Sequence, residues 1–282
     1  MYLDVGDKMI QPFSPIPVID IFAGPGGLGE GFSASLYNGR TRRFQLVLSI
    51  EKDENAHRSL ELRAFFRQFE TGAAPDEYYA YLRGEITREN LFGKFPVQSR
   101  AVALIAWHAE LGGDKFPPKI VDHRIKNALQ RSKMWVLIGG PLCQAYSTVD
   151  RSRLRGADPE GFEADPRHFL YKEYLRILAV HKPPFFIFEN VKGILSSKVN
   201  GENMFTHILA DLQEPDKAMS DQLASGVTAL SGLRYSIFSL SELSASLFLP
   251  KEVSRYVIES EQYRIPQARS SHHEFVPPTQ VR

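Results

Sequence analysis

Short apolar runs that end at glycine or polar residues alternate with amphipathic stretches along this chain. Such runs are typical of strands buried on both faces of a sheet. Clear strands are predicted over 18–22, 44–50, 134–138 and 185–188, and weaker ones over 235–240 and 255–259. Apolar positions at helical spacing predict helices over 28–37, 54–69, 169–181 and 203–213. Because strands and helices alternate, we expect an α/β fold with a mixed, mostly parallel sheet and helices on both faces.

Two long segments lack the strand pattern. Residues 72–133 are rich in helical and loop signals, so they predict a helical insertion within one domain that spans 1–282. Residues 151–167 mix charges with glycine and proline, which is typical of a long loop.

Charge and cysteine content exclude several classes of protein. The 282 residues carry 34 Lys+Arg and 33 Asp+Glu, a net charge of +1, so a chain-wide basic field for nucleic acid is excluded while a local basic patch remains open. Cys143 is the single cysteine, which excludes an internal disulfide and a cysteine-rich zinc site. No apolar run approaches the ~20 residues of a membrane helix, and no signal peptide is visible. We expect a cytoplasmic protein without a metal or a membrane partner.

The segment 20–29 joins the first predicted strand to a helix through a glycine turn. Gly24, Gly26 and Gly29 have the G-x-G-x-x-G spacing of nucleotide-binding turns, in which glycine lets the backbone approach a ligand. A plain strand–helix turn is the alternative interpretation.

Glu51 ends the second predicted strand, where a nucleotide-binding fold places an acid on the ribose hydroxyls. A solvated charge beside Lys52 is the alternative. The turn and the acid fit both NAD and S-adenosylmethionine. Pro25 removes one amide donor from the turn, which disfavours the pyrophosphate of a dinucleotide.

A second motif, 139–147, places Cys143 directly after a predicted strand, in a Gly/Pro turn with polar neighbours. A thiolate nucleophile needs such a partly polar, electropositive place. Arg151, Arg153 and Arg155 follow and are candidates to stabilise a thiolate or to bind phosphates, with a solvated basic loop as the alternative.

Glu189 and Asn190 form a third motif at the end of the strand 185–188. Partial burial there would raise the pKa of the carboxyl and let it carry a proton near neutrality. A helix-capping Glu-Asn pair is the alternative.

Four blocks, residues 20–27, 141–144, 189–191 and 265–269, stand in an order that resembles the DNA cytosine-5 methyltransferases. The resemblance runs from about residue 18 to residue 269. It implies the Rossmann-like fold of the S-adenosylmethionine-dependent methyltransferases. It also implies methyl transfer from S-adenosylmethionine to carbon 5 of a cytosine that is flipped out of double-stranded DNA.

The resemblance also implies roles for single residues. The cofactor-binding residues would be Asp20, Phe22, Gly24, Gly26, Gly27, Leu28, Glu51, Glu85 and Pro141. The catalytic residues would be Cys143, Glu189, Asn190 and Arg269, and the DNA-binding residues Gln144, Ser147, Arg151 and Arg153. Glu85 matches loosely the acid that meets the adenine amino group, and Asp122 is its rival.

The chain departs from the family pattern at three places. Leu142 stands where the family has proline, and Ser271 stands where it has a second arginine after Arg269. The target-recognition region and the last family blocks are missing, and the tail 270–278 does not resemble the strand expected there. A truncated, inactive or split enzyme that binds cofactor only, with a second polypeptide as partner, is therefore an alternative. A tRNA cytosine methyltransferase and an NAD-dependent oxidoreductase are further alternatives.

Overall fold

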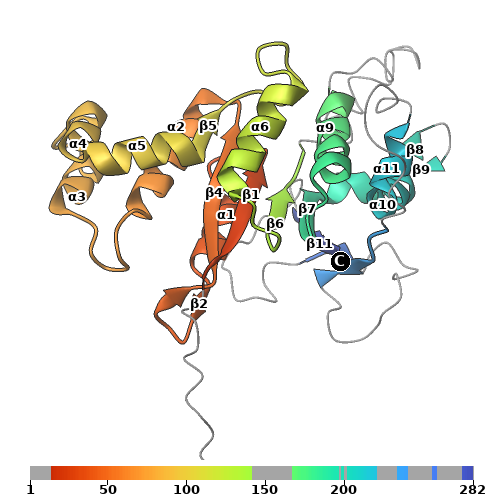
Figure 1. Cartoon of the computed structure of the whole chain (residues 1–282), viewed down its shortest axis with the longest axis horizontal. Coiled ribbons are helices and arrows are strands. Elements are labelled where there is room, and N and C mark those ends of the chain that lie inside the picture. The colour runs from red at the N-terminus through yellow and green to blue at the C-terminus, as the bar shows by residue number, and fades with distance from the viewer. Residues whose placement is uncertain are drawn as a thin grey trace, which may run out of the picture.

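The computed structural model describes residues 14–141, 167–196, 198–199, 202–220, 234–240, 256–258 and 275–281. These residues form a seven-stranded sheet with the order β10-β11-β7-β6-β1-β4-β5 (Figure 1). The strands are β1 (Ile16–Ile21), β4 (Phe44–Glu51), β5 (Ala106–His108), β6 (Val136–Gly139), β7 (Phe185–Val191), β10 (Ile237–Ser239) and β11 (Phe275–Val281). The five strands from β5 to β7 are parallel, and β11 runs antiparallel to both β7 and β10. The predicted mixed, mostly parallel α/β sheet is confirmed.

Helices and two small hairpins connect the strands. The helices are α1 (Gly27–Ser33), α2 (Glu54–Phe66), α3 (Asp76–Leu82), α4 (Arg88–Lys94), α5 (Pro96–Ile105), α6 (Pro118–Leu129), α9 (Arg167–His181), the 3₁₀ helix η2 (Lys192–Ser196), α10 (Met204–Gln213) and α11 (Pro215–Ala218). The hairpins pair β2 (Leu36–Tyr37) with β3 (Thr41–Arg42) and β8 (Lys198–Val199) with β9 (Glu202–Asn203). Among the described residues, no helix is long and apolar enough to span a bilayer.

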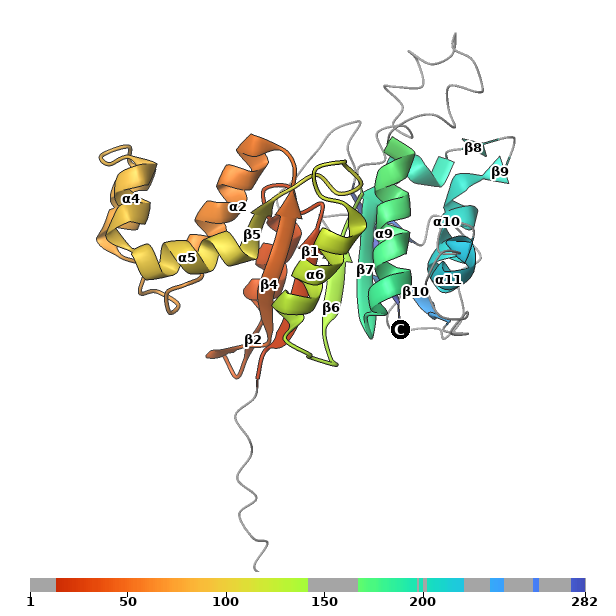
Figure 2. The ribbon, with the colours of Figure 1, turned by 45° about the horizontal axis from the view of Figure 1, so that its top comes forward.

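The sheet is covered on both faces. Figure 2 shows α6 and α9 over one face, where Ile19 and Ile21 of β1 pack with Val121 of α6 and Tyr174 of α9. On the other face, Val18 packs in a smaller cluster with Leu28 and Phe32 of α1. Because successive strand residues point to opposite faces, the continuous apolar run of β1 supplies both cores.

The helices α3, α4 and α5 form an arm beside the β5 edge of the sheet (Figures 1 and 2). An aromatic cluster joins this arm to α2: the ring of Phe65 lies 4.9 Å from Phe92 and 5.8 Å from Phe95. Arg88 of α4 also donates to Glu61 of α2 at 2.8 Å. The arm therefore has its own small core, separate from the two sheet cores.

Several expectations need correction. The segment 72–133 is helical over the arm, but it also contains β5 and α6, which belong to the sheet layers. The last residue of α5 precedes β5 directly, so no turn residue marks that strand.

The helix expected over 28–37 ends at Ser33, and residues 256–258 form no strand. The tail does contain a strand, β11, which pairs with β7 and β10. The predicted loop 151–167 lies almost wholly outside the described residues.

Two glycines of α1 give a matched test of this packing. A Cβ at Gly29 would lie 2.8 Å from Asp20 Oδ2 and 2.9 Å from Leu46 Cδ1, whereas a Cβ at Gly31 would have no neighbour within 4 Å. We expect Gly29→Ala to lower the free energy of unfolding by about 1–3 kcal/mol through overpacking. Gly31→Ala should raise it by about 0.5–1 kcal/mol through helix propensity. Urea denaturation of the two variants measures both changes, and equal effects would contradict this packing.

Candidate active site

The strand register brings the predicted motifs to one edge of the sheet. Ile21 of β1 pairs with Ile50 of β4 and with Gly139 of β6, and Gly139 pairs with Phe188 of β7. The residues that follow these positions therefore stand side by side at the carboxyl edge, where parallel α/β sheets bind their ligands. The glycine turn, Glu51, Gly140 and Glu189 come together in this way.

The glycine turn leaves β1 through three left-handed residues. The φ angles are 57° at Phe22, 55° at Gly24 and 87° at Gly26. A non-glycine residue at positive φ is uncommon, and such strain is concentrated at functional sites. Phe22 is held there by its packing on the main core and by the following amide, Ala23 N, which donates to Ile50 O at 3.0 Å. A Cβ at Gly24 or Gly27 would meet nothing within 4 Å, so this side of the turn is open.

The carboxylate of Glu51 lies against this turn. Its Oε2 accepts a hydrogen bond from Gly24 N at 2.7 Å. Its Oε1 accepts from the amides of Lys52 at 2.9 Å and Asp53 at 2.7 Å. Backbone donors on both oxygens fix the orientation of the carboxylate. A carboxylate oxygen can accept two hydrogen bonds. Oε1 already accepts two and Oε2 accepts one, so Oε2 can accept another from a ligand hydroxyl.

Asp20 lies behind the turn rather than on its open side. Its side chain is 1% exposed, and burial raises the pKa of its carboxyl to about 8, although Arg67 acts in the opposite direction. It faces α1, because a side chain at Gly29 would meet its Oδ2. Its position suits support of the turn from within the protein.

The segment Gly139–Pro141 leads from β6 toward Cys143 and contacts both neighbouring strands. Gly139 leaves no room for a side chain because Ile21 O fills that space, and at Gly140 the carbonyl and Oε2 of Glu189 fill it. The carbonyl of Pro141 accepts a hydrogen bond from Asn190 Nδ2 at 3.4 Å. Residues 139–141 are thus held between β1 and the Glu-Asn pair of β7.

Glu189 is a largely buried acid at this edge. Its Oε1 has no hydrogen-bond partner among the described residues, and burial raises the pKa of the carboxyl to about 7. The group therefore exists near neutrality as a mixture of the carboxylic acid and the carboxylate. An acid in this state can both donate and accept a proton, which is what general acid–base chemistry needs.

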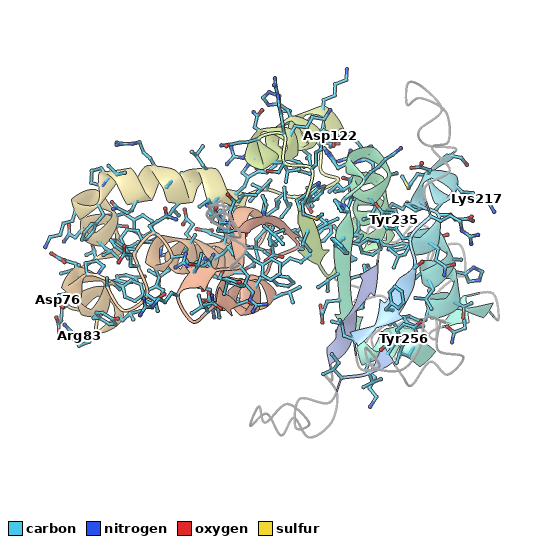
Figure 3. The ribbon with its side chains drawn as sticks, turned by 60° about the horizontal axis from the view of Figure 1, so that its bottom comes forward. Asp76, Arg83, Asp122, Lys217, Tyr235 and Tyr256 are labelled. Atoms are coloured by element: carbon cyan, nitrogen blue, oxygen red, sulfur yellow. The ribbon has the colours of Figure 1, made fainter. Side chains whose placement is uncertain are left out.

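Other predicted residues lie elsewhere. Glu85 forms an exposed ion pair with Arg83, 2.6 Å long, in the arm. Figure 3 shows Arg83 at the far end of the arm, so the structure does not bring Glu85 to the glycine turn. Asp122, the rival acid, accepts from Arg176 at 2.8 Å and from His181 at 2.9 Å between α6 and α9. Burial pushes the pKa of Asp122 upward, but these two hydrogen bonds outweigh it and hold the pKa below its ordinary value.

Seven candidate site residues lie outside the described residues. They are Cys143, Gln144, Ser147, Arg151, Arg153, Arg155 and Arg269. Their roles remain predictions, and so do the roles of the residues that the structure brings together. Among the described residues, no group of three His, Cys, Asp or Glu side chains is placed to hold a metal ion.

The structure adds residues that the sequence did not reveal. His108 pairs in register with Glu51, and its Nε2 lies 2.8 Å from Lys52 O. Its ring stacks on His57 of α2 with centroids 4.9 Å apart. Glu110 follows and binds Lys52 Nζ at 3.1 Å. These side chains extend the edge beyond Glu51 and went unnoticed because β5 was not predicted.

Residues 113–216 match the model of a family described as C-5 cytosine-specific DNA methylase. Type II methyltransferase M.Bpa9945I of Bacillus paralicheniformis is 32% identical over 196 residues, which are 64% of this chain and 42% of that protein. Putative type II methyltransferase M.MjaORF1200P of Methanocaldococcus jannaschii is 29% identical over 198 residues, which are 62% of this chain and 48% of that protein. This chain thus covers less than half the length of either relative.

Among solved structures, the methyltransferase EhMeth of Entamoeba histolytica is similar to this chain. The match has a TM-score of 0.45 and 15% identity, and it covers 95% of this chain and 52% of that one.

The raised pKa of Glu189 predicts a pH-dependent stability. The folded protein binds this proton more tightly than the unfolded chain, so the free energy of unfolding should fall as the pH rises from about 4.5 to about 7. Glu189→Gln removes this contribution and should make the protein more stable than wild type at pH 8 by about 3 kcal/mol, but not at pH 4. Urea denaturation at both pH values tests this, with the exposed Glu70→Gln as control. An unchanged pH profile in Glu189→Gln would show that the carboxyl is not protonated in the folded state.

Proposed function

We propose that the chain transfers the methyl group of S-adenosylmethionine to carbon 5 of cytosine in double-stranded DNA; the match of residues 113–216 to the C-5 cytosine-specific DNA methylase model and the similarity to a type II methyltransferase support this. One observation carries the proposal. Glu51 contacts the glycine turn that follows β1, and Glu189 lies against Gly140, which follows β6; β1 and β6 are adjacent parallel strands, so both contacts are at the same carboxyl edge of the sheet. A methyl donor bound at the turn would therefore face the acid that a cytosine ring needs.

The turn suits S-adenosylmethionine. Gly24 and Gly27 have open space above them, and Glu51 Oε2 is positioned to accept a ribose hydroxyl. Phe22 would pack on the adenine, while Gly26 and Leu28 hold the turn and Pro141 bounds the other side. Asp20 would support the turn from behind. When bound, S-adenosylmethionine supplies a methyl group on a positively charged sulfonium.

The protein residues then activate the base. Carbon 5 of cytosine is a poor nucleophile, so the Cys143 thiolate would add to carbon 6 and turn the ring into an enamine. Glu189 would share its proton with ring nitrogen 3 and stabilise the charge that develops there. Asn190 would hold the exocyclic amine. After transfer, a base removes the proton from carbon 5 and the thiolate leaves.

The remaining predicted residues would hold the DNA. Gln144, Ser147, Arg151 and Arg153 follow the nucleophile in the sequence and would contact the DNA around the flipped base. Arg269 would help to orient Glu189 and the base.

A second candidate is a module that binds cofactor and needs a second polypeptide for methyl transfer. Phe185 and Ile187 of β7, with Leu28 and Phe32 of α1, remain half-buried on the α1 face of the sheet. In this candidate, a segment of a partner chain would cover these side chains further.

Methyl transfer separates the two candidates. We expect radiolabelled S-adenosylmethionine to label mixed-sequence DNA in the presence of the full chain, and DNA with 5-fluorocytosine to trap it covalently. Cys143→Ser should abolish both signals, because it removes the nucleophile while keeping the side-chain shape. Binding of S-adenosylhomocysteine without transfer or trapping would favour the binding module. Labelling of tRNA instead of DNA would overturn the proposed substrate.

Glu51 provides a test of the cofactor site alone. Glu51→Gln replaces a charged acceptor of the ribose hydroxyls, so we expect S-adenosylhomocysteine to bind about tenfold more weakly, which corresponds to about 1.4 kcal/mol. Isothermal titration calorimetry measures the change, and the nearby exposed Glu54→Gln is the matched control. Equal affinities in both variants would mean that Glu51 does not touch the ligand.

A further inference from the structure

Four buried side chains on the elements around the glycine turn carry polar atoms without a hydrogen-bond partner among the described residues. They are Asp20 with both carboxyl oxygens, Ser33 Oγ, Ser49 Oγ and Arg67 Nη2. They come from β1, from α1, from β4 and from the end of α2. Folded proteins rarely leave such groups unsatisfied, and a cluster of them points to a bound polar ligand or water.

Two of the other groups, Ser49 and Arg67, are related to Asp20. Asp20 and Ser49 are register partners on the neighbouring strands β1 and β4, so their side chains stand on the same face of the sheet. Arg67 interacts electrostatically with Asp20, yet no hydrogen bond or ion pair between these two described residues is formed. Asp20 therefore has beside it a hydroxyl of β4 and a guanidinium that acts on its charge, and none of the three is hydrogen-bonded to another described residue through the atoms named above.

Arg67 is fixed from two other sides. Its Nη1 donates to Glu30 Oε2 of α1 at 2.8 Å, and its own carbonyl accepts from Arg42 Nη1 of β3 at 2.9 Å. The side chain is 8% exposed. Because Glu30 holds Nη1 and the side chain is buried, we expect Nη2 to have its partner inside the protein.

We propose that Arg67 is a positioning residue for the glycine turn, and that a buried water molecule joins its Nη2 to Asp20 and Ser49. The Nη2 group donates to the water, and the water donates to a carboxyl oxygen of Asp20 and to Ser49 Oγ. A buried water typically makes about three hydrogen bonds, which this site supplies. The neutral form of Asp20 can also donate to the water, so the link persists in both protonation states.

This link ties together the elements that form the turn. Asp20 is two residues before Phe22 on β1, and Glu30 belongs to α1, which begins where the turn ends. Arg67 connects both, and Arg42 connects it to the β2–β3 hairpin. The spacing between β1 and α1, and with it the shape of the turn, then depends on one guanidinium.

The charges around Asp20 decide what removal of Arg67 does. Burial raises the pKa of Asp20, Arg67 lowers it, and Glu51 of β4 raises it slightly. Glu30 forms ion pairs with both Arg63 and Arg67. The charge of Asp20 also contributes to raising the pKa of the Tyr174 hydroxyl of α9, after burial and Tyr235. Arg67 is the cation that acts on Asp20, so Asp20 should titrate at higher pH without it.

The titration of Asp20 tests this in the full-length chain. We expect Arg67→Met to raise the midpoint of the Asp20 carboxyl carbon shift in NMR by about one pH unit, the usual effect of losing a nearby opposite charge. Arg63→Met is the matched control, because Arg63 is the neighbouring arginine on Glu30 but is 42% exposed. It should leave the midpoint unchanged. A midpoint that stays in place in Arg67→Met, even with reduced stability, would show a packing role only and overturn the proposal.

The water can be sought directly if Arg67→Met does not fold. A crystal structure of the wild-type chain should show an ordered water within hydrogen-bond distance of Arg67 Nη2, Asp20 and Ser49 Oγ. A dry cluster, or a direct ion pair between Asp20 and Arg67, would refute the bridge.

The effect on the cofactor rests on the proposed function and is measured separately. We expect Arg67→Met to weaken S-adenosylhomocysteine binding about tenfold at pH 7, while Arg63→Met binds like wild type. Equal affinities would refute the positioning role. If no variant and no wild-type chain binds S-adenosylhomocysteine, the proposed function fails, whereas the carboxyl titration still decides the link between Arg67 and Asp20.

Discussion

At Gly139, β6 approaches β1 so closely that a single methyl group would overlap the carbonyl oxygen of Ile21. The site depends on this approach. It places the last residue of β6 in register with the residue that precedes the glycine turn. The next residue of the β6 segment, Gly140, lies against Glu189. Both contacts require glycine, because a Cβ at Gly139 would overlap β1 and a Cβ at Gly140 would overlap Glu189 of β7. Two adjacent glycines after a buried strand are thus a packing requirement as well as a turn signal.

Three acids near this edge of the sheet have different surroundings, and these surroundings suit them to different tasks. Glu51 accepts hydrogen bonds from three backbone amides on the open side of the turn. Glu189 has an unpartnered oxygen and a pKa raised to about 7 by burial, which suits proton sharing near neutrality. Asp20 is buried still further, with its pKa raised to about 8, and supports the turn from behind. Separating the protonation behaviour of neighbouring carboxyls by environment is how one fold carries out both binding and acid–base chemistry.

The strands that border the site were predictable because each has a short apolar run that ends at glycine or a polar residue; in 44–50 polar and apolar positions alternate before that run. The prediction was correct within a few residues for β1, β4, β6 and β7. It missed β5, because this strand has three residues and follows α5 without a turn residue. It missed β11, which contains two prolines and forms by pairing with distant strands. The resemblance to the cytosine-5 methyltransferases could be seen from the sequence because its blocks are local, and the family model matches the segment that holds two of them, 141–144 and 189–191.

The sequence by itself determined which chemical groups stand at the ends of the strands, because strand, turn and acid follow one another within a few residues. It could not determine which ends meet, since that depends on strand order and register across more than a hundred residues. The tertiary structure decided that Glu189 lies on Gly140 and Glu51 on Gly24. It also left Glu85 on the arm, paired with Arg83. Burial was likewise settled by packing: the same carboxyl group binds ligands when exposed at an edge and holds its proton when enclosed between a sheet and a helix.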